Sequence, residues 1–411
     1  MIKKLLVSVL LFNLCVPAQS IGQLQLNAYD SLEYSHEIVV EGGIDYSASS
    51  IQKDFISKFY KGGFIDEQMK DNSFNKHRAI NRFGFDAGGQ LEYRNYTAKL
   101  FKNKNWGFLV RAGYQNFGGL LYGQDLFGLV FYGNDRYLGD TINMSGTDLS
   151  FVSYQKLGFG FIDAKSKSNV SLNVYNISDR VSGDFRDLNV IQSAIGDEVQ
   201  VVLDGEVQMK QNLKFNQGIG FGLDVDLRLS VAWYNERTAH IQFLARNVGF
   251  AYMYEKQKAY TFDTTLIFTG FRFDQLIGEN SILNEHTDLL DSMGIHSSEV
   301  NRTFMLPGYL QIGKMVDKQS EYKLQSFFGV RLYPTLIYSP FIFAGADYKA
   351  TNWLHVGGNL SFGGFAGFKT GVYTSFDWGK CNIGMATDNL VGLIHRKGNG
   401  ESLFIRLKCA I

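Results

Sequence analysis

The sequence is poor in proline, cysteine and charge. Its 411 residues include only 4 Pro and 3 Cys, and charged side chains make up 19 % of the chain, below the roughly 25 % of typical soluble domains. Lys and Arg total 40, as do Asp and Glu, so no basic excess indicates a nucleic-acid partner, and we expect none. A mean hydropathy of -0.11 is too low for a protein that crosses a membrane with many helices.

Glycine and aromatic residues are abundant instead. The chain has 44 Gly, and Phe, Trp and Tyr make up 15 % of it. Two classes of protein remain, a large soluble β protein and a transmembrane β-barrel. The alternating strands of a barrel hide their apolar surface from any averaged scale, so the low hydropathy does not count against it.

The N-terminus has the pattern of a signal peptide. Two lysines at positions 3 and 4 precede an apolar run over residues 5–16, which is shorter than the ~20 residues that a spanning helix needs. Small residues follow, so cleavage is expected after Ser20 or after Gly22. We therefore predict a signal peptide over residues 1–22 and an exported chain over 23–411.

No later segment is apolar enough to form a spanning helix. The nearest candidate, residues 332–346, contains Pro334 and Pro340. Since backbone groups in hydrocarbon must all be paired, an exported membrane protein without spanning helices must be a closed barrel.

Strand periodicity dominates from about residue 80 onward. Residues 106–115, 322–333 and 354–362 each alternate an apolar face with a polar, glycine-rich or aromatic one. A soluble sandwich would give the same alternation. Segments such as 80–97 and 218–233 are, however, longer than the 5–6 residues or so usual in globular strands. We predict an all-β membrane protein, an antiparallel transmembrane β-barrel of about fourteen strands in the outer membrane of a Gram-negative cell.

The connections fit this prediction. Short polar turns are expected at residues 102–105, 165–168 and 349–352, and long loops at 49–79, 179–198 and 273–303. The terminal segment, 403–411, alternates to its last residue and is expected to close the barrel against the first strand.

One segment departs from strand periodicity. Between Gly119 and Asn134 the apolar side chains recur near helical spacing, and Asp125 is the only charged residue. A helix there must lie in the lumen as a plug or along the rim. Because Gly218, Gly220 and Gly222 leave room on a strand face, we predict a short helical hatch over residues 119–134 inside the barrel.

Several of these motifs occur in an order that resembles a known group of proteins. They span residues 126–134, 142–146, 153–160, 218–224 and 385–393. The order is similar to that of an uncharacterised family of outer-membrane barrels, known only as a domain of unknown function. That family looks related to the long-chain fatty-acid transporter barrels and to the lipoprotein-shuttling barrel of the type IX secretion system. The resemblance covers roughly residues 30–411 and implies a monomeric barrel of about fourteen strands with an internal hatch, without an established substrate.

The motifs of catalysis and cofactor binding are missing. The glycines from 218 to 222 precede a strand pattern, not the helix that a phosphate-binding loop requires. The chain has no Gly-x-Ser-x-Gly elbow and no Cys or His pattern typical of a metal site. We expect no enzyme activity, no cofactor and no metal. Cys381 and Cys409 could pair in an oxidising compartment, but we favour two small lipid-facing side chains.

Two functions remain open from the sequence. The first is transport or binding of a hydrophobic small molecule, gated by the hatch; the second is a non-enzymatic platform for secreted proteins or lipoproteins. The expected partners are outer-membrane lipid and one of these two ligands. Asp388 sits in a run that terminates a strand and could also face a barrel mouth. The candidate hatch or ligand-contacting residues are Tyr122, Asp125, Leu126, Phe127, Phe131 and Asp388.

Overall fold

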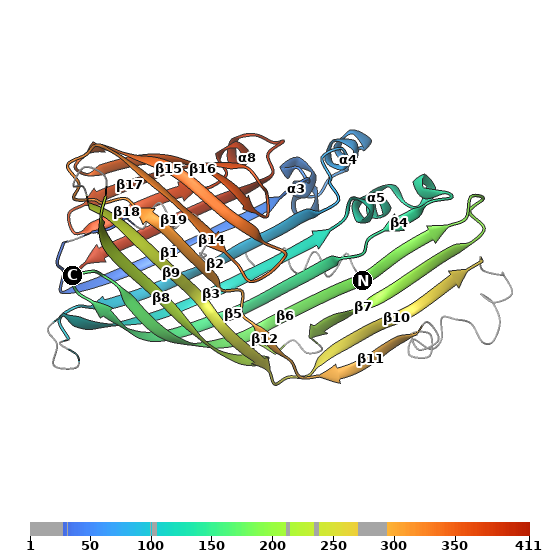
Figure 1. The fold of residues 1–411 in the computed structure, drawn as a ribbon, viewed down its shortest axis with the longest axis horizontal. Helices are drawn as coiled ribbons and strands as arrows, with labels where there is room; N and C mark the ends of the chain where they lie inside the picture. Colours follow the sequence, from blue (N-terminus) through green and yellow to red (C-terminus); the bar gives the residue numbers. More distant parts are fainter. Residues whose placement is uncertain are drawn as a thin grey trace.

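The chain folds into a closed antiparallel barrel of fourteen strands (Figure 1). The computed structural model describes residues 28–269 and 294–411, apart from 31, 99, 101–104, 211–213 and 234–237. In order around the ring, the barrel strands are β1 (His36–Ala48), β2 (Asn81–Asn95), β3 (Trp106–Tyr122), β5 (Thr147–Asp163), β6 (Asn169–Gln192), β8 (Gly218–Ala232), β9 (Thr238–Met253), β13 (Tyr309–Met315), β14 (Leu324–Leu332), β15 (Ser339–Thr351), β16 (Leu354–Gly364), β17 (Lys369–Trp378), β18 (Cys381–Thr387) and β19 (Gly400–Ala410).

The last strand closes the ring against the first, as predicted. Glu37 lies opposite Ala410, and the pairing continues to Ser47 opposite Gly400. In the neighbouring pair, β18 and β19, Cys381 lies directly opposite Cys409 and the two form a disulfide. The interpretation of these cysteines as unpaired apolar side chains was wrong, because the register of the final hairpin brings their Cβ atoms together.

The facing of the strands agrees with the alternation read from the sequence. Outward side chains such as Val110, Val356 and Leu360 are 38 %, 43 % and 57 % exposed, whereas Arg111 and Asn359, which face inward, are buried. The apolar side of each barrel strand therefore lies on the outer surface of the barrel, as a lipid-facing surface requires.

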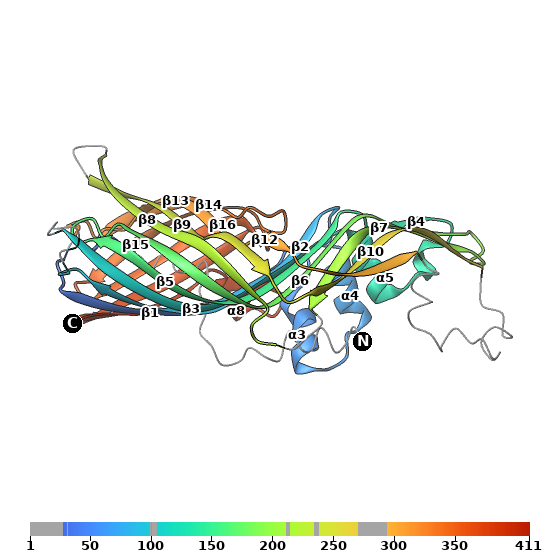
Figure 2. The ribbon, with the colours of Figure 1, turned by 90° about the horizontal axis from the view of Figure 1, so that it is seen from below.

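Four further strands build an extension beyond one end of the barrel (Figures 1 and 2). The outer half of β6 pairs with β7 (Val199–Lys210), which pairs with β10 (Gln257–Phe268), which pairs with β11 (Ile295–Val300); on its other side β6 pairs with β4 (Thr141–Asn143). A last short strand, β12 (Thr303–Met305), pairs with β9. Of the loop predicted at 179–198, the part up to Gln192 is therefore corrected to strand, and a short turn follows it; residues 295–300 of the loop predicted at 273–303 are likewise corrected to strand.

Short helices cluster at the same end. They are α3 (Lys53–Lys61), α4 (Glu67–Phe74), α5 (Gln124–Tyr132), the 3-10 turn η2 (Asp135–Tyr137) and, after β18, α8 (Leu390–Ile394). The Asp66 side chain caps α4 by accepting from the Met69 N–H at 2.8 Å. Two helices thus occupy the region predicted as the loop 49–79, and α5 confirms that residues 119–134 contain a helix. Within the described ranges, no helix has the length and apolar content to cross a membrane.

Some predictions fall on residues outside the described part of the chain. These are the signal peptide over 1–22, most of the turn at 102–105 and residues 273–293 of the long loop.

Candidate functional site

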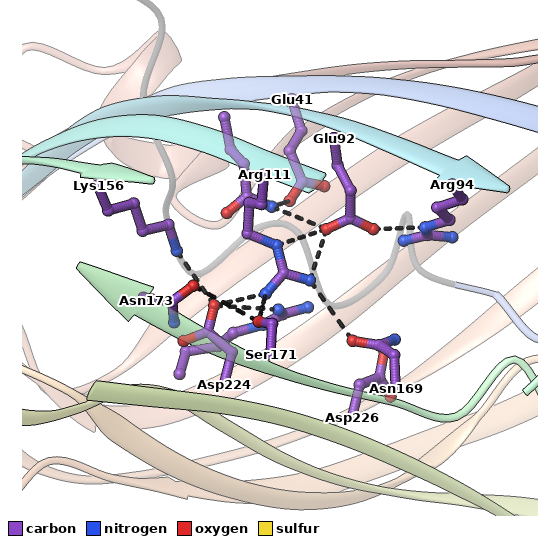
Figure 3. A network of polar contacts seen from close by, with 12 residues as sticks. Glu41, Glu92, Arg94, Arg111, Lys156, Asn169, Ser171, Asn173, Asp224 and Asp226 are labelled. Carbon is purple, nitrogen blue, oxygen red and sulfur yellow. Dashed lines mark hydrogen bonds and ion pairs between the residues drawn. The ribbon is translucent and has the colours of Figure 1, made fainter. Parts of the chain in front are cut away.

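The lumen is filled by charged side chains that are paired with one another (Figure 3). At the centre is Arg111 on β3, which is fully buried. Its Nη1 donates to Asp224 on β8 at 2.6 Å, and its guanidinium pairs with Glu92 on β2 at 2.5 Å. Arg94, also on β2, pairs with Glu92 and, through Nη1 at 2.7 Å, with Glu37 on β1. The network thus joins strands from different sides of the wall.

Asp224 is the most heavily bonded carboxylate of this network. One oxygen accepts from the backbone N–H of Asn247 at 2.6 Å, and the other lies 3.3 Å from Lys156 Nζ and 3.5 Å from Arg246. Desolvating an ion costs several kcal/mol, which only close partners of opposite charge and good hydrogen bonds offset. A network of paired charges of this kind holds the wall in one arrangement.

An aromatic layer closes the lumen nearer the helical end. Phe117 on β3 stacks on Tyr333 with ring centroids 5.4 Å apart, Tyr333 contacts Tyr338 at 4.4 Å, and Tyr338 meets Phe365 edge-on at 4.9 Å. Tyr333 and Tyr338 belong to the loop between β14 and β15, and Phe365 to the turn between β16 and β17. Loops that fold inward, together with Ile337, therefore make the layer.

The helix α5 does not contribute to this layer. On β3, Gly119 faces the lumen, where a Cβ would meet Ile337 and Phe365. The next residue, Leu120, therefore faces outward, and with its partner Phe83 it packs against the cluster around Phe127. The helix lies outside the wall, along the rim, next to α3, α4 and β4 (Figure 2). The prediction of a hatch inside the lumen is corrected.

The glycines that were expected to make room for the hatch face the barrel's own side chains. A Cβ at Gly222 would meet Tyr175, and one at Gly357 would meet Tyr373. The space that these glycines leave is thus used by tyrosines of the neighbouring strands.

Five of the six candidate residues come together in the rim cluster. Phe127 is 2 % exposed and packs on Phe55 of α3 and on Phe131, with Leu126 at the edge of the same cluster. The Tyr122 hydroxyl lies 3.0 Å from His77 Nε2, and Asp125 accepts from the Asn143 backbone N–H at 2.9 Å. These contacts stabilise the rim.

Asp388 lies apart from this cluster, fully buried at the end of β18. Its backbone N–H donates to Ser402 Oγ at 2.9 Å, and the next residue, Asn389, caps α8 by accepting from the Gly392 N–H at 2.9 Å. This geometry fits the strand-terminating interpretation of the segment.

The extension carries a continuous apolar face. Phe185 and Phe262 both lie opposite Gly205, and their rings are 6.0 Å apart. Since side chains alternate along a strand, the same face holds every second residue of the paired segments. Its apolar members, half-buried and hereafter called the apolar face, are Val181, Phe185, Leu188, Val190, Val199, Val201, Leu203, Val207, Met209, Tyr260, Phe262, Leu266 and Phe268.

This apolar face continues the outer surface of the barrel. Val181, at its start, pairs with Phe151, which shares the outward side of β5 with the exposed Leu157 and Phe159. The opposite face of the extension is polar, with Asp204, Glu206 and Gln208 on β7. The strands that leave the membrane region thus keep their apolar side turned outward.

Comparison with known families gives one match. Residues 162–388 match the family of unknown function DUF5723. The chain belongs to this family. A comparison with curated proteins finds no match.

Solved structures with a similar barrel exist, all at low identity. The DUF5723 chain is similar to the toluene transporter TbuX of Ralstonia pickettii (11 % identity, 96 % of this chain and 92 % of that one, TM-score 0.39). It is also similar to a FadL homologue of Pseudomonas aeruginosa (8 % identity, 96 % and 98 %, TM-score 0.40) and to a TodX deltaS2S3 mutant monoaromatic hydrocarbon channel (9 % identity, 92 % and 89 %, TM-score 0.40).

Sequence reasoning missed the two main features of this DUF5723 barrel, the charged lumen and the apolar face. A signal for the first was available. Charges recur at every second position in Glu92-x-Arg94 and in Asp224-x-Asp226-x-Arg228, which places several ions on one inward face. A signal for the second was the recurrence of apolar residues at every second position, Val199, Val201 and Leu203. This pattern lies farther along the chain than a membrane-spanning strand needs to reach.

Proposed function

We propose that this protein is a sealed outer-membrane barrel whose extension binds an exported protein or lipoprotein. The observation that carries the proposal is the contrast between a lumen filled with paired charges and an uncovered apolar face on the extension. A barrel built to conduct would leave polar lumen groups solvated along a path. Here the central lumen charges, Glu92, Arg111 and Asp224, are paired with one another.

The apolar face supports a role in docking because of its extent and position. It spans β6, β7 and β10, and none of its members belongs to a hydrophobic cluster of the described residues, whereas Phe83 of β2 and Leu120 of β3 pack in the cluster of α3, α4 and α5. Contiguous apolar surface of this kind marks interaction sites on proteins. The adjoining β11 is a short edge strand with exposed side chains from His296 to Glu299, so a partner strand could also add to the sheet there.

A pair of photo-crosslinking variants tests this function. A photoreactive residue at Leu203 lies in the middle of the apolar face, and one at Asp204 lies one position away on the polar face. We expect a discrete protein adduct in cells from position 203 and none from position 204. Equal labelling from both positions, or adducts with lipid alone from 203, would contradict docking of a protein at this face.

Binding of a hydrophobic small molecule is the second candidate, and a recess in the wall favours it. The lining of this recess includes the apolar side chains Met315, Val316, Phe327 and Phe343, as the lining of a site for an apolar ligand would. Co-purification of lipid from the intact barrel, abolished by Phe327→Ala and retained in Leu203→Asp, would favour this function over docking.

The proposal places the mature chain in the outer membrane as a monomer. The measurement is fractionation combined with migration on gels before and after heating, where a folded barrel runs differently from its unfolded chain. Recovery in the soluble periplasm would contradict it.

A further inference from the structure

Asp30, Lys167 and Lys408 are among the residues that line a charged recess. It lies at the end of the barrel where the chain terminates; Figure 1 shows this end on the side opposite the helices α3 to α5. The N-terminal segment forms one side through Asp30, and residues from the inner wall and from two turns form the rest. The cationic side chains of the lining are Arg94, Lys167, Arg228, Lys318, Arg406 and Lys408.

Positive charge predominates in this lining. Six cationic side chains face two carboxylates, Asp30 and Glu37. Lys408 Nζ lies 2.9 Å from both of these carboxylates, so a single lysine already neutralises much of the negative charge. Carboxylates just outside the lining hold several of the other cations, as Asp377 holds Lys318 at 2.7 Å.

Lys167 differs from the other cations of the recess. It is 4 % exposed, and its Nζ has no hydrogen-bond partner among the residues that the structure describes. The ammonium lies 4.2 Å from the centre of the Tyr96 ring, which favours a cation at this position. The backbone of Lys167 lies in the left-handed region (φ 61°), in the turn between β5 and β6. The turn itself therefore directs the Lys167 side chain inward. Three N–H donors are therefore held in a buried site without an acceptor, at a cost that a bound acceptor would remove.

We propose that this recess binds a small anion with phosphate-type oxygens, and that Lys167 is its principal donor. Phosphate oxygens accept several charge-assisted hydrogen bonds at once, which suits converging ammonium and guanidinium groups. The lining residues face the lumen, so we commit to a free anion that enters from the barrel end. A lipid headgroup offers the same chemistry and is separated from it below. The site is independent of the proposed docking function, since it lies at the other end of the barrel.

The experiment measures binding of inorganic phosphate to the full barrel in a zwitterionic detergent, by calorimetry and by thermal unfolding. Chloride keeps the ionic strength constant. The test variant is Lys167→Met, which keeps the length of the side chain and removes its donors. The matched control is Lys165→Met, because Lys165 lies in the same turn but is exposed. A third variant, Lys167→Arg, restores charge and donors.

We expect phosphate to bind and stabilise the wild type and the Lys165→Met variant alike. Lys167→Met should weaken binding about tenfold or more, as loss of a charged hydrogen bond does, and Lys167→Arg should recover part of it. Absence of any phosphate effect on the wild type overturns the proposal, even if Lys167→Met fails to fold. Equal weakening by the variants at 165 and 167 also overturns it, because it would reflect surface charge.

Vesicles distinguish the source of the anion. Stabilisation by phosphatidylglycerol vesicles that depends on Lys167, without any effect of free phosphate, would overturn the free-anion assignment in favour of a lipid headgroup. Stabilisation by free phosphate, with no difference between phosphatidylglycerol and phosphatidylcholine vesicles, supports the proposal.

Discussion

Side chains in the lumen of the barrel and side chains on the extension beyond its rim differ in how far they are buried and paired. In the lumen, Glu92, Arg111 and Asp224 are almost completely buried, and each has partners of opposite charge. On the extension, Phe262 and its neighbours on the apolar face lie half-buried and belong to none of the hydrophobic clusters of the described residues. The paired charges of the interior therefore stabilise the wall, whereas the apolar face of the extension still has surface that a contact could bury.

The rim cluster shows what a completed outer face looks like. Phe83 and Leu120 face outward from β2 and β3, as Phe185 and Phe262 do from β6 and β10, but α3, α4 and α5 cover them. The same fold thus contains a covered and an uncovered apolar patch on one side of its wall. Under the proposed function, the uncovered patch is the surface that a partner covers.

The largest expected effect comes from breaking the lumen network. Arg111→Met leaves Glu92 and Asp224 without their central cation, and removing one partner of a buried pair costs ~3–5 kcal/mol. Arg186→Met is the control, because the pair of Arg186 with Asp204 is exposed and such pairs contribute about 0–1 kcal/mol. Urea unfolding in detergent measures both. Equal free energies of unfolding for the two variants would show that the network does not stabilise the barrel.

A second pair of variants compares the covered with the uncovered patch. Phe127→Ala removes a ring that is 2 % exposed, and we expect a local loss of ~3–5 kcal/mol. Phe262→Ala, on the uncovered face, should cost about 0.5 kcal/mol in the isolated protein. Hydrogen exchange in α3–α5 and in β10 measures the two losses. A large cost at Phe262 would mean that the apolar face is already covered in the free barrel.

A smaller effect concerns pH at the rim. Burial lowers the pKa of His77 below 6.5, although its hydrogen bond to the Ser73 carbonyl opposes this. In the folded rim the His77 ring is therefore neutral. Below about pH 6.5 the ring binds a proton when the rim unfolds. We expect the rim to be fully stable above about pH 6.5 and to lose at most about 1.4 kcal/mol per pH unit below it. Limited proteolysis of α3–α5 across this range, flat in His77→Gln, checks the effect; an unchanged slope in the variant would assign it to another group.

Much of the barrel could be predicted from the sequence because strands have a period of two. The alternation at residues 354–362 gave the correct facing, and the alternation at 403–411 gave the closing strand. The predictions that failed concern features that depend on strand register or on tertiary contacts. A shift of one residue on β3 decides whether α5 lies inside or outside, and the Cys381–Cys409 pair depends on the register of the final hairpin. The stretch from Val181 to Gln192 mixes polar and apolar residues as a loop does, and its pairing with β4, β5 and β7 shows it to be a strand.

Conductance in planar bilayers tests most directly whether the barrel is sealed and its function lies on the outside. We expect the intact protein to be nearly silent, and deletion of residues 124–131 to leave it silent, because α5 packs on the outer side of β2 and β3. Strong conductance of the intact protein, or a pore opened by deleting α5 alone, would contradict the account.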